Sequence, residues 1–359
     1  MRVATIFSGI GAPEAALGKE HEIVFGCEID RFARQTYLAN HSCSLLYDNV
    51  WNIPHDCPDF DLLVFGFPCQ SYSMLGKRLG FQDERGAVLF PCLDILKAKQ
   101  PKYFIAENVK GLLYHEKGET MKTILGNMTE CGYRVSYEVL NSRCFGVPQN
   151  RERVFFVGIR NDLDLAFSFP APTVTAITLQ DVLEQDVDRK YYLSNAMKEW
   201  YNRNAVFRIK KRYTNIDRPF AQCLVSSCIR ATNWITDDFR FADVKIPFLE
   251  PDTPIRRLTP RECARLHGFD DSFIIPVSDS QAYKQFGNTM TVPILAALFA
   301  RLEMQKRRNN CYGLAPLLFW WMADSVKTSM VINIPKNTNP LSASIQAYKR
   351  AFLVGIKSP

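Results

Sequence analysis

Short apolar runs alternate with helix-like segments through the first 160 residues, and this alternation limits the possible folds more than any other feature of the chain. The runs with the length and composition of strands are Arg2–Phe7, Glu22–Glu28, Leu45–Tyr47, Leu62–Phe67, Tyr103–Glu107, Arg134–Asn141 and Arg153–Ile159. The helical segments between them are Pro13–Lys19, Arg31–Asn40, Gly86–Lys99 and Thr120–Cys131. Strands that alternate with helices predict an α/β fold with a doubly wound, mostly parallel sheet.

The composition fits such a fold and argues against a secreted or membrane protein. Of 359 residues, 47% are hydrophobic and 23% are charged, which is ordinary for a globular chain with a substantial core. No stretch approaches the roughly 18 apolar residues of a membrane-spanning helix, and the N-terminus does not resemble a signal peptide. We therefore expect a soluble, cytoplasmic protein.

The eleven cysteines are scattered, odd in number and never spaced as Cys-x-x-Cys. This usage predicts reduced thiols in place of a disulfide framework. His41-x-Cys43 followed by His55-x-Cys57 could be drawn as a zinc site, but the spacing is atypical for zinc ligands. The sequence therefore predicts no metal.

The net charge of +7 is concentrated in two regions. Residues 201–235 carry seven Lys and Arg against one acid, and residues 301–359 carry nine against two, so the remainder is net acidic. Basic patches on an acidic body favour a polyanionic partner. The alternative is a solvated basic face without a partner.

The pattern changes after Pro170-Ala-Pro172, and from about 166 to 254 prolines, aromatics and basic residues intersperse without a clear period. This predicts a second, irregular domain. Regularity returns at Thr259, a predicted N-cap followed by proline and by Glu262 in the capping-box position, and Gly268 is expected to end that helix. A longer helix is expected over Val292–Arg308.

The first strand leads into a glycine turn, Phe7-Ser-Gly-Ile-Gly11. Glu14 occupies the place of the third glycine in a dinucleotide fingerprint, which disfavours a pyrophosphate at the helix N-terminus. Glu28 ends the second strand, where an acid can bind ribose hydroxyls, and Asp48 follows the third. These features fit a nucleoside without a pyrophosphate, such as S-adenosylmethionine. The alternatives are a structural turn for the glycines and a helix-cap role for Glu28.

Pro68-Cys69-Gln70 follows the fourth strand, and Glu107-Asn108-Val109 ends the fifth. The carboxyl ends of parallel strands are where open α/β sheets bind ligands. A thiol and a carboxyl group there predict a nucleophile with a proton donor. The alternative is a buried structural cysteine, which is the usual fate of this residue.

Gln149, Arg151 and Arg153 alternate along an extended segment and are therefore expected to share a face. Two guanidiniums on that face suit an anionic or carbonyl-rich ligand. The alternative is pairing with Glu152 or nearby acids. Gln285-Phe-Gly-Asn-Thr289 forms a glycine turn before the last helix.

In this order, from residue 3 to about 305, the motifs resemble those of the bacterial and phage DNA cytosine-5 methyltransferases. The cofactor turn, Pro68-Cys69-Gln70, Glu107-Asn108-Val109 and Gln149-x-Arg151-x-Arg153 match four family motifs. The segments 257–268 and 285–293 match its two closing motifs. Six matches in the family's order are far more specific than any one of them.

The resemblance implies a Rossmann-like, S-adenosylmethionine-dependent methyltransferase fold and a covalent mechanism. The Cys69 thiolate would attack carbon 6 of a flipped-out cytosine, Glu107 would stabilise charge at ring nitrogen 3, and Arg153 with Arg151 would bind the carbonyl oxygen or a phosphate. The implied cofactor residues are Phe7, Gly9, Ile10, Gly11, Glu28, Ile29, Asp48, Pro68, Asn288 and Thr289. The implied DNA contacts are Gln70, Ser71, Gln149, Arg208, Lys210, Lys211 and Arg212.

The resemblance also divides the chain. Residues 1–165 would form the catalytic and cofactor domain, 166–254 the target-recognition domain, and 255–310 the segment that completes the catalytic domain, with 311–359 an extension of unassigned role. The implied partner is double-stranded DNA, acted on by a monomer in restriction-modification or phage self-protection. One departure concerns target recognition, where Gln222-Cys223-Leu224 stands in place of the family's usual Thr-Leu.

Other classes fit less well. A relative that acts on transfer RNA would share the catalytic motifs, but its characteristic recognition insert is missing. An inert DNA-binding module would need a broken motif, whereas Cys69, Glu107 and both arginines are present. The incomplete glycine pattern disfavours a nicotinamide dehydrogenase.

Overall fold

The computed structural model describes residues 1–18, 21–68, 88–173, 176–207, 214–215, 217–226, 233–236, 245–246 and 252–312. Its contacts form two units, Met1–Lys306 and Arg307–Pro359. The site residues predicted at Cys69, Gln70, Ser71, Arg208, Lys210, Lys211 and Arg212 lie outside the described residues, as does the tail after 312.

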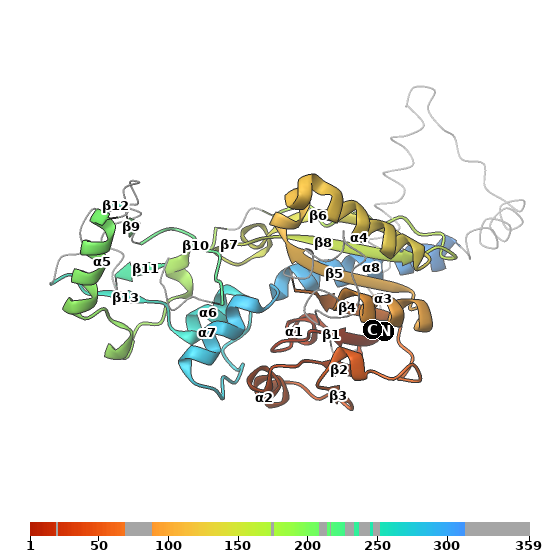
Figure 1. Cartoon of the computed structure of the whole chain (residues 1–359), viewed down its shortest axis with the longest axis horizontal. Coiled ribbons are helices and arrows are strands. Elements are labelled where there is room, and N and C mark those ends of the chain that lie inside the picture. Colours follow the sequence, from red (N-terminus) through yellow and green to blue (C-terminus); the bar gives the residue numbers. More distant parts are fainter. Residues whose placement is uncertain are drawn as a thin grey trace, which may run out of the picture. The chain divides into compact units, whose positions relative to one another are not determined.

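A seven-stranded sheet in the order β3-β2-β1-β4-β5-β8-β6 forms the centre of the first unit (Figure 1). Its strands are β1 (Arg2–Ile6), β2 (Glu22–Cys27), β3 (Leu46–Tyr47), β4 (Leu62–Gly66), β5 (Tyr103–Val109), β6 (Tyr133–Asn141) and β8 (Glu152–Arg160). β1 to β5 pair in parallel, and β8 runs antiparallel to both β5 and β6. The prediction of a doubly wound, mostly parallel sheet is confirmed.

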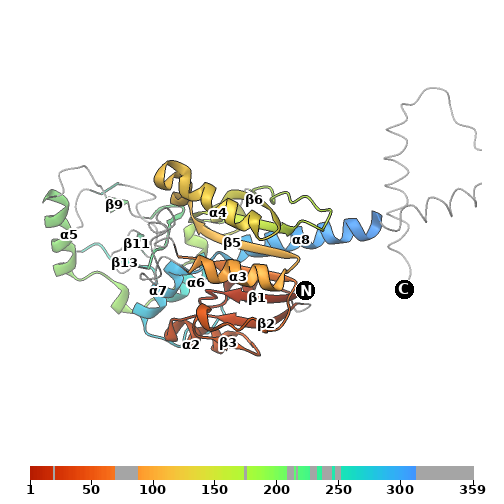
Figure 2. The ribbon, with the colours of Figure 1, turned by 45° about the vertical axis from the view of Figure 1, so that its right-hand side comes forward.

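Helices cover both faces of this sheet because its strands are apolar on both sides. Side chains of α3 (Leu89–Lys99) and α4 (Glu119–Glu130) pack on one face, in the cluster that contains Ala4, Phe65 and Phe104. The opposite face packs against α1 (Ala12–Ala16), α2 (Arg31–Asn40), α6 (Pro260–Leu266), α7 (Asp279–Asn288) and α8 (Val292–Tyr312). Figures 1 and 2 show these layers from two directions. The chain therefore returns after residue 255 to complete the core that the first strands begin.

The element boundaries follow local sequence signals closely. α2 has the predicted limits, and the strands differ from the predicted ones by at most two residues at either end. At the start of α6 the Thr259 hydroxyl accepts from the Glu262 N–H, and the Glu262 carboxylate accepts from the Thr259 N–H, which is the predicted capping box. α8 continues to Tyr312, beyond the predicted end at Arg308.

The described parts of 142–257 are short elements outside the main sheet, apart from β8. The strands are β7 (Gln149–Asn150), β9 (Thr214–Asn215), β10 (Ala221–Gln222), β11 (Trp234–Thr236), β12 (Lys245–Ile246) and β13 (Ile255–Arg257). They pair as β7–β10, β9–β12 and β11–β13. α5 covers Asn195–Phe207, and single 3₁₀ turns lie at Ser142–Phe145, Leu179–Val182 and Arg189–Tyr191, with others at Val50–Asn52 and Lys110–Gly118. The domain limits within 1–310 stay a prediction.

Candidate active site

The carboxyl ends of β4 and β5 bring two of the predicted motifs together. Gly66 is in register with Glu107, and the Asn108 side chain donates a hydrogen bond of 2.7 Å to the Phe67 carbonyl. A Cβ at Gly66 would lie 2.8 Å from the Met290 methyl, so any larger residue there would displace the end of that side chain. The chain that leads to Pro68 is therefore fixed beside the end of β5. Cys69 comes next but is outside the described residues.

Glu107 faces Arg153 from the neighbouring strand β8. The Arg153 Nε lies 3.1 Å from Glu107 Oε1, and the two side chains are 14% and 12% exposed. Arg153 also donates through Nη1 to the Glu152 carbonyl at 2.8 Å. Burial raises the pKa of Glu107, and the Arg153 and Arg151 guanidiniums only partly oppose this. The carboxyl group therefore keeps its proton to higher pH than a free glutamate.

Arg151 has a different environment, although it lies only two residues before Arg153. Its guanidinium is buried and donates to the carbonyl oxygens of Leu224 at 2.8 Å, Thr289 at 2.7 Å and Gly287 at 3.3 Å. Arginine suits this arrangement because its guanidinium presents several N–H donors in a fixed planar geometry. Here these donors reach three carbonyl oxygens from two segments that are distant in sequence. Arg151 therefore connects the segment that contains Leu224 to the end of α7, and this geometry argues against the predicted direct contact with a ligand.

Gln149 is also engaged within the protein. It is fully buried, its amide nitrogen donates to the Leu266 carbonyl at 2.9 Å, and its oxygen accepts from the Leu224 N–H at 3.0 Å. Because both ends of the amide are satisfied by backbone groups, the geometry argues against the predicted DNA contact. The sequence grouped Gln149, Arg151 and Arg153, but it could not distinguish the two that bond to backbone groups of other segments from the one that faces Glu107.

Gly287 has a packing role that the sequence did not reveal. A Cβ built on it would lie 2.1 to 2.5 Å from backbone atoms of Val225 and Ser226. The glycine therefore lets the backbone of residues 225 and 226 contact the last turn of α7 directly. The only signal in the sequence was the glycine within Gln285-Phe-Gly-Asn-Thr289.

The glycine turn after β1 adopts left-handed backbone conformations, with φ of 55° at Phe7, 57° at Gly9 and 87° at Gly11. Its shape is fixed by Glu28, whose carboxylate accepts from the N–H of Gly9 and from that of Asp30, each at 2.8 Å. Burial raises the pKa of Glu28. The ends of β1 and β2 are therefore joined through the Glu28 side chain, and the nucleoside site stays a prediction.

The remaining predicted cofactor residues divide into accessible and buried ones. Ile29 is 70% exposed beside Glu28, the Asp48 side chain is 64% exposed, and Pro68 and Asn288 are also exposed. Two others face inward: Ile10 is a core residue and Thr289 is buried. A Cβ at Gly11 would collide with the His41 ring, so this glycine also faces the protein.

Glu14 has a role that the sequence did not predict. Its carboxyl oxygen accepts from the Thr5 hydroxyl at 2.6 Å and from the Tyr37 hydroxyl at 2.9 Å, in the interior beneath the turn. Burial raises the pKa of Glu14. The side chain therefore braces β1 against α2, away from the place where a pyrophosphate would lie.

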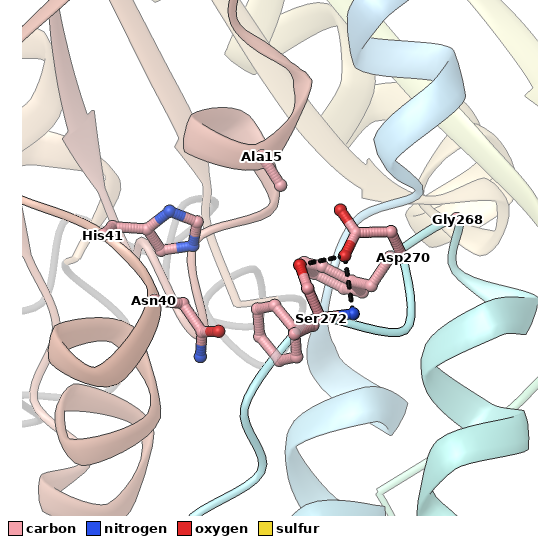
Figure 3. A pocket seen from close by; sticks show the side chains of 8 residues that line it. Ala15, Asn40, His41, Gly268, Asp270 and Ser272 are labelled. Carbon is pink, nitrogen blue, oxygen red and sulfur yellow. Dashed lines mark hydrogen bonds between the residues drawn. The ribbon is translucent and has the colours of Figure 1, made fainter.

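A pocket of about 250 Å³ lies elsewhere, between α1, the end of α2 and the loop after α6. Figure 3 shows His41 and Asn40 facing Asp270 and Ser272 across it. It contains none of the predicted catalytic or cofactor residues. Its polar groups bond within the protein: Asn40 to Ile274, His41 to Ile10 and Asp270 to Ser272.

In the described part of the chain, no three His, Cys, Asp or Glu side chains gather as metal ligands would. The Cys43 thiol, one member of the possible zinc pattern, instead donates to the Leu45 carbonyl. No helix among the described residues has the length and hydrophobicity to span a membrane.

Comparisons with known proteins give one consistent result. The profile of the C-5 cytosine-specific DNA methylase family matches residues 1–304. The Type II methyltransferase M.NlaX of Neisseria lactamica is 40% identical over 308 residues, covering 84% of this chain and 96% of its own. M.HpaII of Haemophilus parainfluenzae is 38% identical, with 81% and 86% covered. The solved structure of a Spodoptera frugiperda DNMT2 mutant superimposes with a TM-score of 0.69 at 23% identity, covering 84% of this chain and 99% of that one.

Proposed function

The chain belongs to the C-5 cytosine-specific DNA methylase family and is a DNA cytosine-5 methyltransferase, and we propose that it transfers a methyl group from S-adenosylmethionine to a flipped-out cytosine through a covalent bond to Cys69. One observation carries this proposal: a buried carboxyl group of raised pKa, Glu107, faces Arg153 at the sheet edge to which Pro68 leads.

The groups at the ends of β1, β2 and β3 fit S-adenosylmethionine. The Glu28 carboxylate suits ribose hydroxyls, the exposed Ile29 offers an apolar surface for a base, and Asp48 is an accessible acceptor for an amino group. A Cβ at Gly9 would meet nothing within 4 Å, so the turn leaves open space. When bound, the cofactor would supply an electrophilic methyl group.

Cys69 would make carbon 5 of cytosine nucleophilic. Its thiolate adds to carbon 6, and the electron pair of the ring double bond moves towards nitrogen 3, which takes or shares a proton from Glu107. Carbon 5 would then take up the methyl group, with S-adenosylhomocysteine as the leaving group. A base would remove the carbon 5 proton as the Cys69 thiolate departs, and nitrogen 3 would return its proton to Glu107, which restores the ring. The raised pKa of Glu107 supports this role, because the group must carry a proton at working pH.

Arg153 would act on the same base. Its Nε is directed at Glu107, while Nη1 donates to the Glu152 carbonyl and Nη2 contacts the Cys223 sulfur. A positive group here stabilises negative charge on the cytosine carbonyl oxygen. The structural engagement of Arg151 supports Arg153 as the arginine that acts at the site.

The DNA must expose the target base for this chemistry. Carbon 6 is inaccessible in a stacked duplex, so the cytosine would be flipped out at a cost of a few kcal/mol. The basic composition of residues 201–235 would contribute phosphate contacts that help offset this cost. Protection of DNA in a restriction-modification system or a phage agrees with the Type II names of the relatives.

Trapping tests the proposal directly. Duplex DNA with 5-fluorocytosine in varied contexts is incubated with the protein and S-adenosylmethionine, and adducts are mapped by mass spectrometry. Fluorine cannot leave as a cation, so the expected product is a stable bond between Cys69 and carbon 6. Cys69→Ser should bind cofactor but form no adduct. Cofactor binding without an adduct in any DNA context, or an adduct only with transfer RNA, would contradict the proposal.

A further inference from the structure

Cys223 lies against both arginines of the site. Its sulfur is 3.5 Å from Arg151 Nη1 and 3.7 Å from Arg153 Nη2. The residue is partly buried and belongs to the recognition segment, where Gln222-Cys223-Leu224 replaces the expected Thr-Leu. A thiol from a segment 70 residues away in sequence therefore contacts the guanidinium that faces Glu107.

The backbone holds Cys223 in place without help from its own side chain. Ala221 and Gln222 pair with Gln149 and Asn150 in the β7–β10 ladder, and the Gln222 N–H donates to the Asn233 side chain at 2.7 Å. Beyond Cys223, the Leu224 carbonyl accepts from Arg151 at 2.8 Å. The position of the Cys223 sulfur is thus set by backbone contacts of the residues on either side of it, with β7, Asn233 and Arg151.

The orientation of the thiol suits an acceptor role. The S–H of Cys223 donates to the Leu224 carbonyl at 3.4 Å, which leaves the sulfur lone pairs for N–H donors. The three nitrogens of Arg153 then each have a partner: Nε has Glu107, Nη1 has the Glu152 carbonyl and Nη2 has Cys223. Without the sulfur, one end of this guanidinium would lose its contact.

We propose that Cys223 is a positioning residue, whose sulfur holds the Arg153 guanidinium beside Glu107 when residues 221–224 lie against β7 and Arg151. The role rests on the proposed function of Glu107 and Arg153. Through this contact the position of residues 221–224 would affect catalysis, because displacement of these residues removes the sulfur acceptor from Arg153. An oxygen acceptor at this position, from serine or threonine, would serve the same purpose.

Steady-state kinetics of Cys223→Ala, Cys223→Ser and the wild-type protein test the proposal, with Cys144→Ala as the matched loss of another partly buried thiol. We expect Cys223→Ala to lower kcat about fivefold, the effect of losing a contact of about 1 kcal/mol, with KM for DNA changed less. Cys223→Ser should restore most of kcat, and Cys144→Ala should match the wild type.

The pH profile separates positioning from a general structural effect. The Arg153 and Arg151 guanidiniums act to lower the pKa of Glu107. A misaligned Arg153 would do so less, so in Cys223→Ala the loss of activity at high pH should begin at higher pH than in the wild type. A change in the folded fraction would lower kcat without moving this limb.

Three results would overturn the proposal: an unchanged kcat in Cys223→Ala, a lower kcat with an unmoved high-pH limb, or no restoration by serine. Failure of the proposed function itself has a different signature. In that case the wild-type protein would form no Cys69 adduct and would not methylate DNA.

Discussion

Two arginine–carboxylate pairs in this molecule have opposite designs. Arg256 and Glu262 are 1% and 0% exposed and join through two hydrogen bonds of 2.9 and 2.8 Å, and the same carboxylate accepts from the N–H groups of Thr259 and Glu184. Glu107 and Arg153 approach through one contact of 3.1 Å, and no described residue donates an aligned hydrogen bond to Glu107 Oε1.

We infer from this difference that the Arg256–Glu262 pair serves stability and the Glu107–Arg153 pair serves the reaction. A buried carboxylate with four donors is held in one position and joins α6 to the preceding strand and the 3₁₀ segment near Glu184. Glu107, in contrast, is buried beside one poorly aligned guanidinium. Its carboxyl group has a raised pKa and an oxygen without an aligned donor, so it is suited to exchange a proton with a substrate. Breaking each pair should therefore affect a different property.

The largest expected effect is on catalysis. Glu107→Gln removes the proton donor but keeps the shape, so kcat should fall by about 10²- to 10⁴-fold. Methyl transfer to DNA from labelled cofactor measures this, with thermal unfolding as the control for folding. A variant that unfolds more easily but retains kcat would place Glu107 with the structural pairs.

The buried pair should instead determine stability. Glu262→Gln leaves Arg256 without its charged partner and should lower the free energy of unfolding by about 3–5 kcal/mol. Urea denaturation measures the loss. Activity per folded molecule should stay near that of the wild type, and a selective loss of kcat would contradict the assignment.

An intermediate effect is expected where Val225 and Ser226 contact the last turn of α7 at Gly287. Gly287→Ala forces a methyl group into the backbone of Val225 and Ser226, at a cost of about 1–3 kcal/mol. Because Arg151 joins the same two segments, kcat should fall together with stability. Gly126→Ala, at a helical position with open space, is the control. Unchanged unfolding and kcat in Gly287→Ala would show that the contact is not tight.

The smallest expected effect is a dependence of stability on pH. The raised pKa of Glu107 means that the folded state binds its proton more tightly, so its contribution is fully present below the unfolded pKa and is lost as pH rises through the folded pKa. Glu107→Gln avoids this loss. Its free energy of unfolding, measured by urea denaturation at several pH values, should therefore rise relative to that of the wild type as pH rises, by about 1.4 kcal/mol for each unit by which the folded pKa exceeds the unfolded one. If the advantage of the variant in free energy of unfolding shrinks as pH rises, the contact with Arg153 stabilises the Glu107 carboxylate by more than burial destabilises it.

Much of the fold could be read from local patterns, because they arise from interactions within a few residues. The apolar runs, the Thr259 capping box and the limits of α2 all depend on backbone and neighbouring side chains. The motif order was likewise sufficient to indicate the family. The inward turn of Glu14 was not predictable, since its partners Thr5 and Tyr37 come from other elements.

The sequence by itself determined the sheet, the chemistry-bearing motifs and the residue types available at the site. Only the tertiary structure decided which of the two arginines faces Glu107, because carbonyls of Leu224 and Thr289, far away in sequence, accept from Arg151 and leave Arg153 beside the carboxyl group. Alternation along a strand sets the side to which residues point. What meets them on that side is fixed by segments that folding brings from elsewhere in the chain.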